Sequence, residues 1–317
     1  MLTRYLTVAP GRGVRRRLAP HANANSPPLE RPRRSSRPTL AIGGGDSMIR
    51  LLNMSDRTAP ASLGSPLTGH TSEVDELVFA PDGRTLAGDD QGTTMRLWNL
   101  PARLLTGQTR GFSVANHVGA VAFSPDGRTL VSGHYDKSLR WWNVSNPARA
   151  ASPRPPVTMH TDTVCALDFS PDGRTLAAAD GNSRVRLWDV SERSQAAPLG
   201  EPLSEHTSGV GALAFSPDGR TLATDEGETV QLWDVSDPKR AAPRGEPLEG
   251  HTGSIRTLAF SPDGRTLASA GNDQVIRVWD MDLGQDIKRI CANTRNTPAA
   301  DEWRRHVSSG IPFPAPC

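Results

Sequence analysis

Apolar and polar positions alternate in short runs between residues 39 and 280, and turn-forming residues separate the runs. Residues 250–280, GHTGSIRTLAFSPDGRTLASAGNDQVIRVWD, show this most clearly. The runs 254–260, 266–270 and 275–279 predict three strands. Pro-Asp-Gly at 262–264 and Asn-Asp at 272–273 predict the turns between them, because glycine and Asn or Asp adopt the required backbone angles at little cost. The segment before the next such unit predicts a fourth, outer strand.

This pattern repeats along the chain. The string PDGRTL occurs five times at intervals of 44 to 46 residues, with its Asp at Asp82, Asp126, Asp172, Asp218 and Asp263. A Trp follows each string, and a His precedes four of them by twelve residues. A partial sixth unit, TLAIGGGDSMIRLLN at 39–53, has Leu52 at the Trp position. Repetition of four antiparallel strands at this period predicts an all-β propeller.

The GH, SPDG and WD elements at a period near 45 resemble the WD40 repeat family over residues 39–283. The resemblance implies a WD40 β-propeller with five clear repeats plus a partial sixth, and six or seven blades in a complete or incomplete ring. Repeat folds gain stability by stacking neighbours. The partial unit should have its first strand near residues 24–34, where none is recognisable, so we expect an open seam or marginal stability.

The same resemblance implies a buried hydrogen-bonded chain of a His, a strand-two Ser or Thr, a turn Asp and the strand-three Trp. The last repeat has all four residues, and the earlier repeats have parts of the set. In chain order the candidates are His70 and Trp98; Ser132, Asp136 and Trp142; His160 and Trp188; His206, Thr224 and Trp233; His251, Ser269, Asp273 and Trp279. In the second repeat, His117 lies three residues closer to the turn than its counterparts. Metal binding or acid–base chemistry is the alternative for recurring His and Asp, but buried imidazole and indole groups need hydrogen-bond partners, which favours a structural role.

The formal net charge of +2 conceals a strong asymmetry. Residues 1–38 contain nine Arg and one Glu, whereas the remainder contains 27 basic and 33 acidic residues. The Arg- and Pro-rich composition of residues 1–38 predicts a basic, disordered tail. Three interpretations remain for it: an arm for nucleic acid or acidic proteins, a tail without function, or a misassigned start of the chain.

Other features exclude several classes of protein. Cys165, Cys291 and Cys317 lack the spacing of a zinc site or a disulfide framework, and Cys165 is expected to be a buried, inert thiol, while a bridge between Cys291 and Cys317 is not expected in a reducing cytosol. The sequence has neither a membrane-length apolar run nor a signal peptide, so we expect a cytoplasmic protein. It contains no phosphate-binding loop, HExxH, GxSxG or CxxC motif. We therefore expect no enzyme activity, no cofactor and no metal.

Residues 284–317 form a separate C-terminal segment. GQDIKRICANTRN and TPAADEWRRHV predict two helices, the second with Thr297 as N-cap and Pro298 at its first position. The segment resembles the one that follows WD40 repeats in large bacterial signalling NTPases and regulators, on the basis of Ile290, Cys291, Trp303 and Cys317. The predicted organisation is thus a tail (1–38), a propeller (39–283) and a helical cap (284–317).

Function is expected to reside on the propeller surface. The PDGR turns place five Arg on one rim, each two residues after an Asp, so a self-neutralised rim is favoured over a phosphate-binding ring. Acidic residues in other turns indicate a basic partner. We expect a non-catalytic scaffold in bacterial-type signalling that binds proteins or peptides, neither membranes nor, except through the tail, nucleic acid. The alternatives are the detached sensor portion of a STAND-type NTPase or transcription regulator, and a propeller hydrolase.

Overall fold

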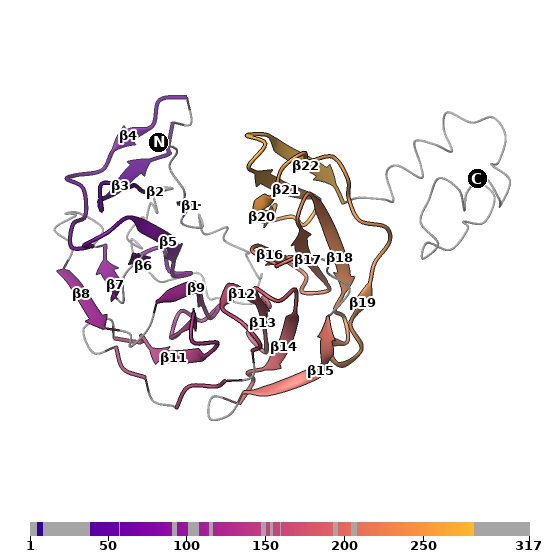
Figure 1. The fold of residues 1–317 in the computed structure, drawn as a ribbon. Coiled ribbons are helices and arrows are strands. Elements are labelled where there is room, and N and C mark those ends of the chain that lie inside the picture. Colours follow the sequence, from indigo (N-terminus) through magenta and orange to yellow (C-terminus); the bar gives the residue numbers. More distant parts are fainter. Residues whose placement is uncertain are drawn as a thin grey trace, which may run out of the picture. The chain divides into compact units, whose positions relative to one another are not determined.

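A computed structural model describes residues 5–8 and 39–281, apart from residues 57, 91–93, 101–107, 114–116, 147–149, 153–154, 159, 193–195 and 204–207. The chain divides into two compact units, Met1–Val114 and Ala115–Cys317. The described residues form six antiparallel sheets, and their only helical element is the three-residue 3-10 helix η2 (Figure 1). The predicted all-β fold of repeated antiparallel sheets is confirmed.

The first unit contains two four-stranded sheets. Sheet 1 consists of β1 (Tyr5–Val8), β2 (Thr39–Gly43), β3 (Ile49–Asn53) and β4 (Ala61–Ser62). Sheet 2 consists of β5 (Val74–Phe79), β6 (Thr85–Asp90), β7 (Thr94–Asn99) and β8 (Gln108–Ser113). One core joins the two sheets, because Ile49 and Leu51 of β3 pack with Leu86 and Trp98 of sheet 2, all at most 2% exposed.

The second unit contains four sheets. Sheet 3 consists of β9 (Val118–Phe123), β10 (Thr129–His134) and β11 (Leu139–Asn143). Sheet 4 consists of β12 (Val164–Phe169), β13 (Thr175–Asp180), β14 (Val185–Asp189) and β15 (Ala197–Leu203). Sheet 5 consists of β16 (Leu213–Phe215), β17 (Thr221–Glu226), β18 (Thr229–Asp234) and, after η2 (Pro238–Arg240), β19 (Ala242–Pro243). Sheet 6 consists of β20 (Ile255–Phe260), β21 (Thr266–Gly271) and β22 (Ile276–Asp280).

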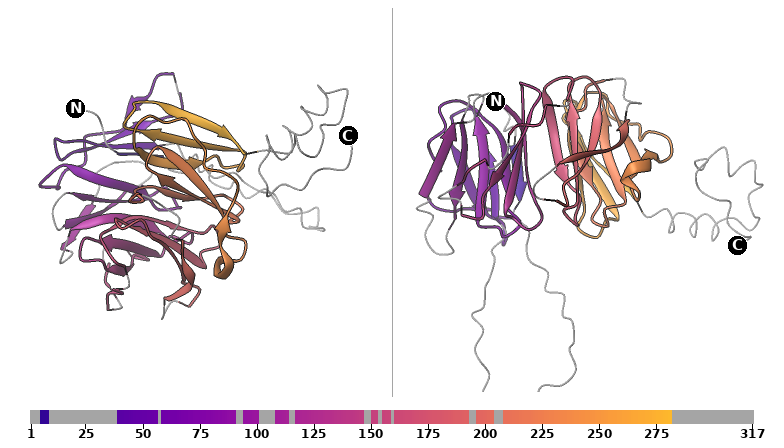
Figure 2. Two further views of the ribbon diagram at one scale, coloured as in Figure 1. Left: turned by 45° about the vertical axis from the view of Figure 1, so that its right-hand side comes forward. Right: turned by 90° about the horizontal axis from the view of Figure 1, so that it is seen from below.

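Neighbouring sheets of the second unit pack face against face (Figure 2). Ala177 and Ala179 on β13, both 0% exposed, face Leu222 and Trp233 of sheet 5 in one core. Side chains alternate between the two faces of a strand, so small residues on one face allow the next sheet to approach closely. Strand β13 is accordingly buried at all six positions, because its Ala177 and Ala179 pack in one core and its Leu176 and Ala178 pack in another.

Strand β1 corrects one prediction. Tyr5–Val8 lie within the expected tail, yet they pair antiparallel with β2 in the register Tyr5↔Gly43 to Val8↔Leu40. A strand from far upstream therefore pairs with the edge of β2 that the sequence left without a partner, whereas residues 24–34, where that strand was sought, lie outside the described residues. Residues 9–38 and 282–317, including the predicted helices and Cys291 and Cys317, lie outside the described residues.

Candidate functional site

The predicted buried chain of polar side chains is present in sheet 6. His251 Nε2 lies 2.7 Å from Ser269 Oγ, and the indole N–H of Trp279 donates to the same hydroxyl at 2.9 Å. On the other side of the ring, His251 Nδ1 lies 2.7 Å from Asp273 Oδ2. Burial of Asp273 opposes its ionisation, but hydrogen bonds from His251 and from backbone N–H groups outweigh it and lower the pKa. One hydroxyl thus joins the imidazole to the indole.

Sheet 3 builds a related arrangement with a different histidine. The indole N–H of Trp142 donates to Ser132 Oγ at 2.8 Å, and Ser132 Oγ lies 2.8 Å from Nε2 of His134, which is 0% exposed. Asp136 instead pairs with Arg140 at 2.8 Å. His117 is exposed and its ring lies 5.6 Å from the ring of Tyr135. Of the predicted residues, the structure therefore joins Ser132 and Trp142.

Sheet 5 preserves the contact between the strand-two hydroxyl and the Trp. The indole N–H of Trp233 donates to Thr224 Oγ1 at 2.9 Å, and both side chains are buried. His206, predicted as the third member, lies outside the described residues.

Sheets 2 and 4 lack the hydroxyl, since Gly88 and Ala178 occupy its position. The ring centroids of His160 and Trp188 lie 5.8 Å apart. Among the described residues, neither the imidazole nitrogens of His160 nor the indole nitrogen of Trp188 has a hydrogen-bond partner. The same holds in sheet 2 for His70 and Trp98, whose ring centroids lie 5.1 Å apart. In these two sheets the His and Trp rings therefore pack directly against each other at a tilt, whereas in sheets 3 and 6 a hydroxyl joins the two rings.

A carboxylate at the end of the second strand, which the sequence did not predict as part of the polar chain, lies beside each of these histidines. Nδ1 of His70 lies 3.2 Å from Asp90 Oδ2, and Nδ1 of His160 lies 3.7 Å from Asp180 Oδ2. Burial nevertheless lowers the pKa of His70, and lowers that of His160 to about 4, so both rings are neutral at pH 7. A buried, neutral imidazole beside an indole supports a structural role for these residues.

Sequence reasoning missed Asp90, His134 and Asp180. All three occupy the end of the second strand, eight residues before the Trp, where the last repeat has Gly271. The signal was present in the sequence: in the first and third repeats the turn position lacks Asp, and an Asp appears two residues earlier.

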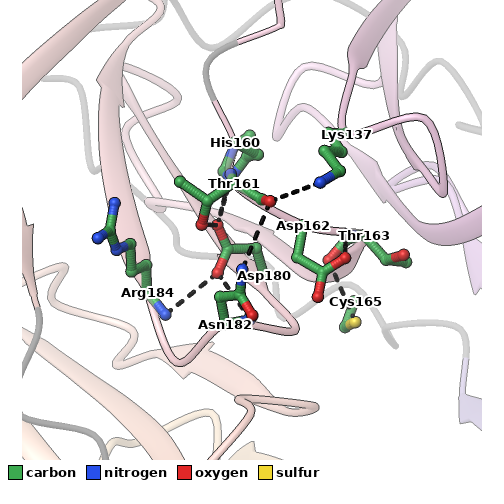
Figure 3. A network of polar contacts seen from close by, with 9 residues as sticks. All are labelled: Lys137, His160, Thr161, Asp162, Thr163, Cys165, Asp180, Asn182 and Arg184. Atoms are coloured by element: carbon green, nitrogen blue, oxygen red, sulfur yellow. Dashed lines mark hydrogen bonds and ion pairs between the residues drawn. The ribbon is translucent and has the colours of Figure 1, made fainter.

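A network at one end of sheet 4 shows how Asp180 is used (Figure 3). Its Oδ2 accepts hydrogen bonds from the backbone N–H and the hydroxyl of Thr161, and its Oδ1 accepts from the backbone N–H of Asn182 and Arg184. Lys137 Nζ donates to the carbonyl oxygen of Thr161 at 2.7 Å, which connects sheet 3 with the loop entering sheet 4. The exposed turns at this end are therefore fixed in place by hydrogen bonds.

Cys165 lies in the same region and is half-buried. Its thiol donates to the carbonyl oxygen of Thr163 at 3.3 Å. Burial and nearby carboxylates raise the pKa of Cys165 to about 11, so the thiol stays protonated at neutral pH.

The PDGR turns at the opposite ends of sheets 3 to 6 share one construction. In the turn that enters β13, the hydroxyl of Ser170 donates to Asp172 Oδ1 at 2.6 Å and accepts from the backbone N–H of Thr175 at 2.9 Å. The backbone N–H of Arg174 also donates to Asp172 Oδ1, at 3.0 Å. The Arg side chains of all five PDGR turns are exposed: Arg84, Arg128, Arg174, Arg220 and Arg265.

A cavity of about 840 Å³ lies among the PDGR turns of sheets 3 and 4 and the chain around η2. Trp141 and Phe169, 3% and 7% exposed, contribute aromatic surface to its wall. Five acidic residues and two basic ones also line it, namely Asp126, Asp172, Asp189, Glu192 and Asp237, with Arg174 and Lys239. The cavity therefore combines an apolar wall with an excess of carboxylates.

Hydrogen bonds keep two of these carboxylates ionised. The hydroxyl and backbone N–H of Ser191 lower the pKa of Asp189. Burial of Asp172 opposes its ionisation, but the hydroxyl of Ser170 and the backbone N–H of Arg174 lower its pKa overall. Both side chains are therefore negatively charged at neutral pH and favour a cationic ligand.

No group of three or more His, Cys, Asp or Glu side chains in the described part of the chain is placed to hold a metal ion. Nor do the residues that the structure describes form a helix with the length and apolar character needed to cross a bilayer.

Comparison with known families matches five stretches of the chain to the family described as WD domain, G-beta repeat: residues 62–99, 108–143, 154–189, 198–234 and 244–280. Each stretch begins before the first strand of a sheet, so that 62–99 starts in β4 and 198–234 starts in β15. A search of curated proteins finds no match. Because the five stretches cover more than half of the sequence and coincide with the repeated sheets, the chain belongs to the WD40 repeat family, whose members generally act as protein-interaction scaffolds.

Proposed function

We propose that this chain is a non-catalytic interaction module that binds a basic peptide segment of a partner protein in the cavity beside sheets 3, 4 and 5. The observation that carries the proposal is the excess of carboxylates around an aromatic wall. A Lys or Arg side chain can place its aliphatic stem on an apolar surface while its charged end meets carboxylates. Membership of a family of interaction scaffolds supports the same function.

The size of the cavity is consistent with a peptide. Ligand sites typically enclose about 300–1,000 Å³, and the cavity holds about 840 Å³. Trp141 and Phe169 reach the wall with only a small part of their rings, since they are 3% and 7% exposed, and this apolar edge can contact the aliphatic stem of a Lys or Arg. Carboxylates from three successive sheets surround this edge and would select a cationic sequence over an acidic one.

We place this module in a bacterial-type signalling system as a scaffold, which rests on the resemblance of residues 284–317 to segments of such proteins. The second candidate is that the chain is the detached sensor portion of a STAND-type NTPase or transcription regulator. Copurification from its native host separates the two, because a sensor should bring down an NTPase and a scaffold should bring down several partners.

Peptide binding can be measured by fluorescence anisotropy with two labelled dodecapeptides that differ only in having Arg and Lys or Glu at the charged positions. We expect the basic peptide to bind and the acidic one not to bind. Affinity should fall as salt rises, because salt screens the attraction between the peptide and the exposed carboxylates.

The sharpest comparison uses two equivalent aspartates. Asp172 lines the cavity, whereas Asp218 holds the same position in the PDGR turn of sheet 5 and does not line it. Asp172→Asn combined with Glu192→Gln should weaken basic-peptide binding severalfold, and Asp218→Asn should leave it unchanged. Equal losses in both variants, or equal binding of the two peptides, would contradict the proposed site.

A further inference from the structure

Sheet 6 has one packed face and one bare face. Its packed face contributes Leu258 and Leu267 to the core shared with sheet 5. The strand registers place six other side chains on the opposite face: Thr257, Ala259, Ala268, Ala270, Ile276 and Val278. We call this the open face. Ile276 is 75% exposed and Val278 is 67% exposed.

The residues of the open face are of the type that is buried elsewhere in this chain. The positions of Ile276 and Val278 correspond to Val185 and Leu187 on β14, which are 0% and 2% exposed. In sheet 4 the neighbouring sheet 5 covers these positions. The open face is thus built for an apolar covering, and none of its six side chains carries a charge.

We infer that residues 284–317 of this chain fold back onto the open face and cover it. The described chain reaches Met281 directly after β22, the strand that carries Ile276 and Val278. Thirty-six residues follow, from Asp282 to Cys317. The covering segment therefore starts beside the surface that needs it.

Length and sequence pattern agree with this assignment. A five-residue strand is about 17 Å long, and a helix over residues 284–296 would be about 20 Å long. Within that predicted helix, Ile287, Ile290 and Cys291 follow the i, i+3, i+4 spacing of a single apolar stripe. Trp303 and Val307 are four residues apart in the second predicted helix and form another.

The contour of the open face suits large side chains. Ala259, Ala268 and Ala270 stand next to each other in the strand register, with Ile276 and Val278 beside them. Short side chains on the inner two strands next to longer ones on β22 leave a shallow depression. Trp303 can fill such a depression with an apolar ring and keep its N–H at the rim. A segment tethered a few residues away is also present at a high effective concentration, which favours it over a second copy of the chain.

The test measures how fast a maleimide labels residue 278 in the full-length Val278→Cys protein, with Cys291 and Cys317 changed to Ser. Residue 278 is exposed on the sheet, so the substitution should not disturb folding. With the segment docked, labelling should be about tenfold or more slower than in the same protein carrying Ile290→Ala and Trp303→Ala. A matched control, Ser62→Cys at the exposed edge of sheet 1, should label at one rate in both backgrounds.

The outcomes separate the possible occupants. Slow labelling that is independent of protein concentration and is relieved by the two alanine substitutions supports the inference. Slow labelling that persists in the alanine variant means that something other than residues 284–317 covers the face, a second copy if the labelling slows further with protein concentration, and this overturns the inference. Fast labelling at residue 278 in both backgrounds leaves the open face uncovered and also overturns it.

Discussion

A single hydroxyl decides whether the buried Trp of a repeat has a hydrogen-bond partner. Ser132, Thr224 and Ser269 each accept the indole N–H of the Trp in their own sheet. Gly88 and Ala178 cannot, and the indole nitrogens of Trp98 and Trp188 have no hydrogen-bond partner within the described chain. An unpartnered buried polar group costs about 1–3 kcal/mol. These two repeats therefore contribute less stability than their neighbours.

Restoring the hydroxyl in sheet 4 should stabilise the protein. Ala178→Ser keeps the existing Cβ and adds an oxygen between His160 and Trp188, so we expect a gain of about 0.5–1.5 kcal/mol in the free energy of unfolding. The measurement is urea unfolding followed by Trp fluorescence. Gly88→Ser is the matched comparison in sheet 2, where a Cβ would lie 2.7 Å from Leu77 Cδ2. It should give no gain, and equal effects of the two substitutions would refute this account.

The polar chain could be predicted from sequence only where all four residues stand at their usual spacing, as in sheet 6. In sheet 3, His134 approaches Ser132 from the same strand rather than from the loop before the sheet. A hydroxyl accepts a hydrogen bond from any donor within reach. Sequence spacing therefore cannot tell which histidine bonds the hydroxyl when no histidine stands at the usual position before the sheet.

Among the elements, the hairpin of sheet 5 has a two-residue loop, whereas the corresponding loops of sheets 3, 4 and 6 have four residues. β17 ends at Glu226 and β18 begins at Thr229, which leaves Gly227 and Glu228 as a two-residue loop. Gly227 has φ 65°, as the first central residue of a type II′ turn requires. The corresponding longer turn of sheet 6 has Gln274 at φ 62°. The shorter loop therefore depends on glycine, whereas the longer one tolerates a side chain.

Gly227→Ala should lower the free energy of unfolding by about 1 kcal/mol, because a Cβ is strained at positive φ. Gly211 is the matched control in the same sheet, since an added Cβ there meets nothing within 4 Å and its φ is not positive. Gly211→Ala should be neutral or slightly stabilising, because alanine has less freedom in the unfolded chain. Chemical unfolding of both variants tests the pair, and a larger loss at Gly211 would contradict it.

The PDGR turn of sheet 2 lacks one of the hydrogen bonds that the other turns have. Ala80 stands where Ser124, Ser170, Ser216 and Ser261 each bond the turn Asp. Ala80→Ser should raise the free energy of unfolding by about 0.5–1.5 kcal/mol. Ser124→Ala should lower it by a similar amount. Thermal unfolding of the two variants checks this, and shifts of the same sign would show that the hydroxyl does not stabilise the turn.

Most strands could be located from sequence because alternation and turn residues recur together. β1 could not, because it lies outside the repeat and its pairing with β2 spans more than thirty residues of sequence. Nor could the cavity, because its wall and carboxylates come from three sheets and depend on how those sheets stack. Local periodicity defines strands, whereas a surface shared between strands needs their relative positions.

At the scale of the whole molecule, buried groups give opposite pH dependences. Burial raises the pKa of Asp168 to about 7, although its Oδ2 accepts the backbone N–H of Phe215 in the next sheet at 2.8 Å. Between about pH 4 and 7, Asp168 holds a proton in the folded state that it lacks in the unfolded state, so its contribution to stability is lost as pH rises through 7 and levels off above that value. His160, with a pKa of about 4 when folded, contributes stability that is complete above pH 6.5 and lost as pH falls toward 4. The two effects oppose each other between pH 4 and 6.5, and of these two groups Asp168 is the one that continues to titrate above that range.

Asp168→Asn should therefore remove the decline in stability between pH 6.5 and 8, because the amide oxygen still accepts the N–H of Phe215 and carries no charge. Urea midpoints at pH 6, 7 and 8 measure the effect, and the variant should exceed the natural protein at pH 8. Asp218→Asn, at an exposed turn, serves as the control and should leave the slope unchanged. If the urea midpoints of Asp168→Asn and of the natural protein changed with pH in parallel, Asp168 would not titrate in this range.

The stagger between sequence repeat and sheet has a genetic consequence. Residues 198–234 supply β15 to sheet 4 and β16, β17 and β18 to sheet 5. Recombination that duplicates or deletes one such stretch would exchange an edge strand together with three inner strands. Each inserted repeat would therefore supply the outer strand of the preceding sheet and the three inner strands of the next sheet, so that the two sheets are covalently connected at once. A gene broken at a repeat boundary would instead leave the preceding sheet without its edge, so this architecture favours gain and loss of whole internal repeats over cutting between them.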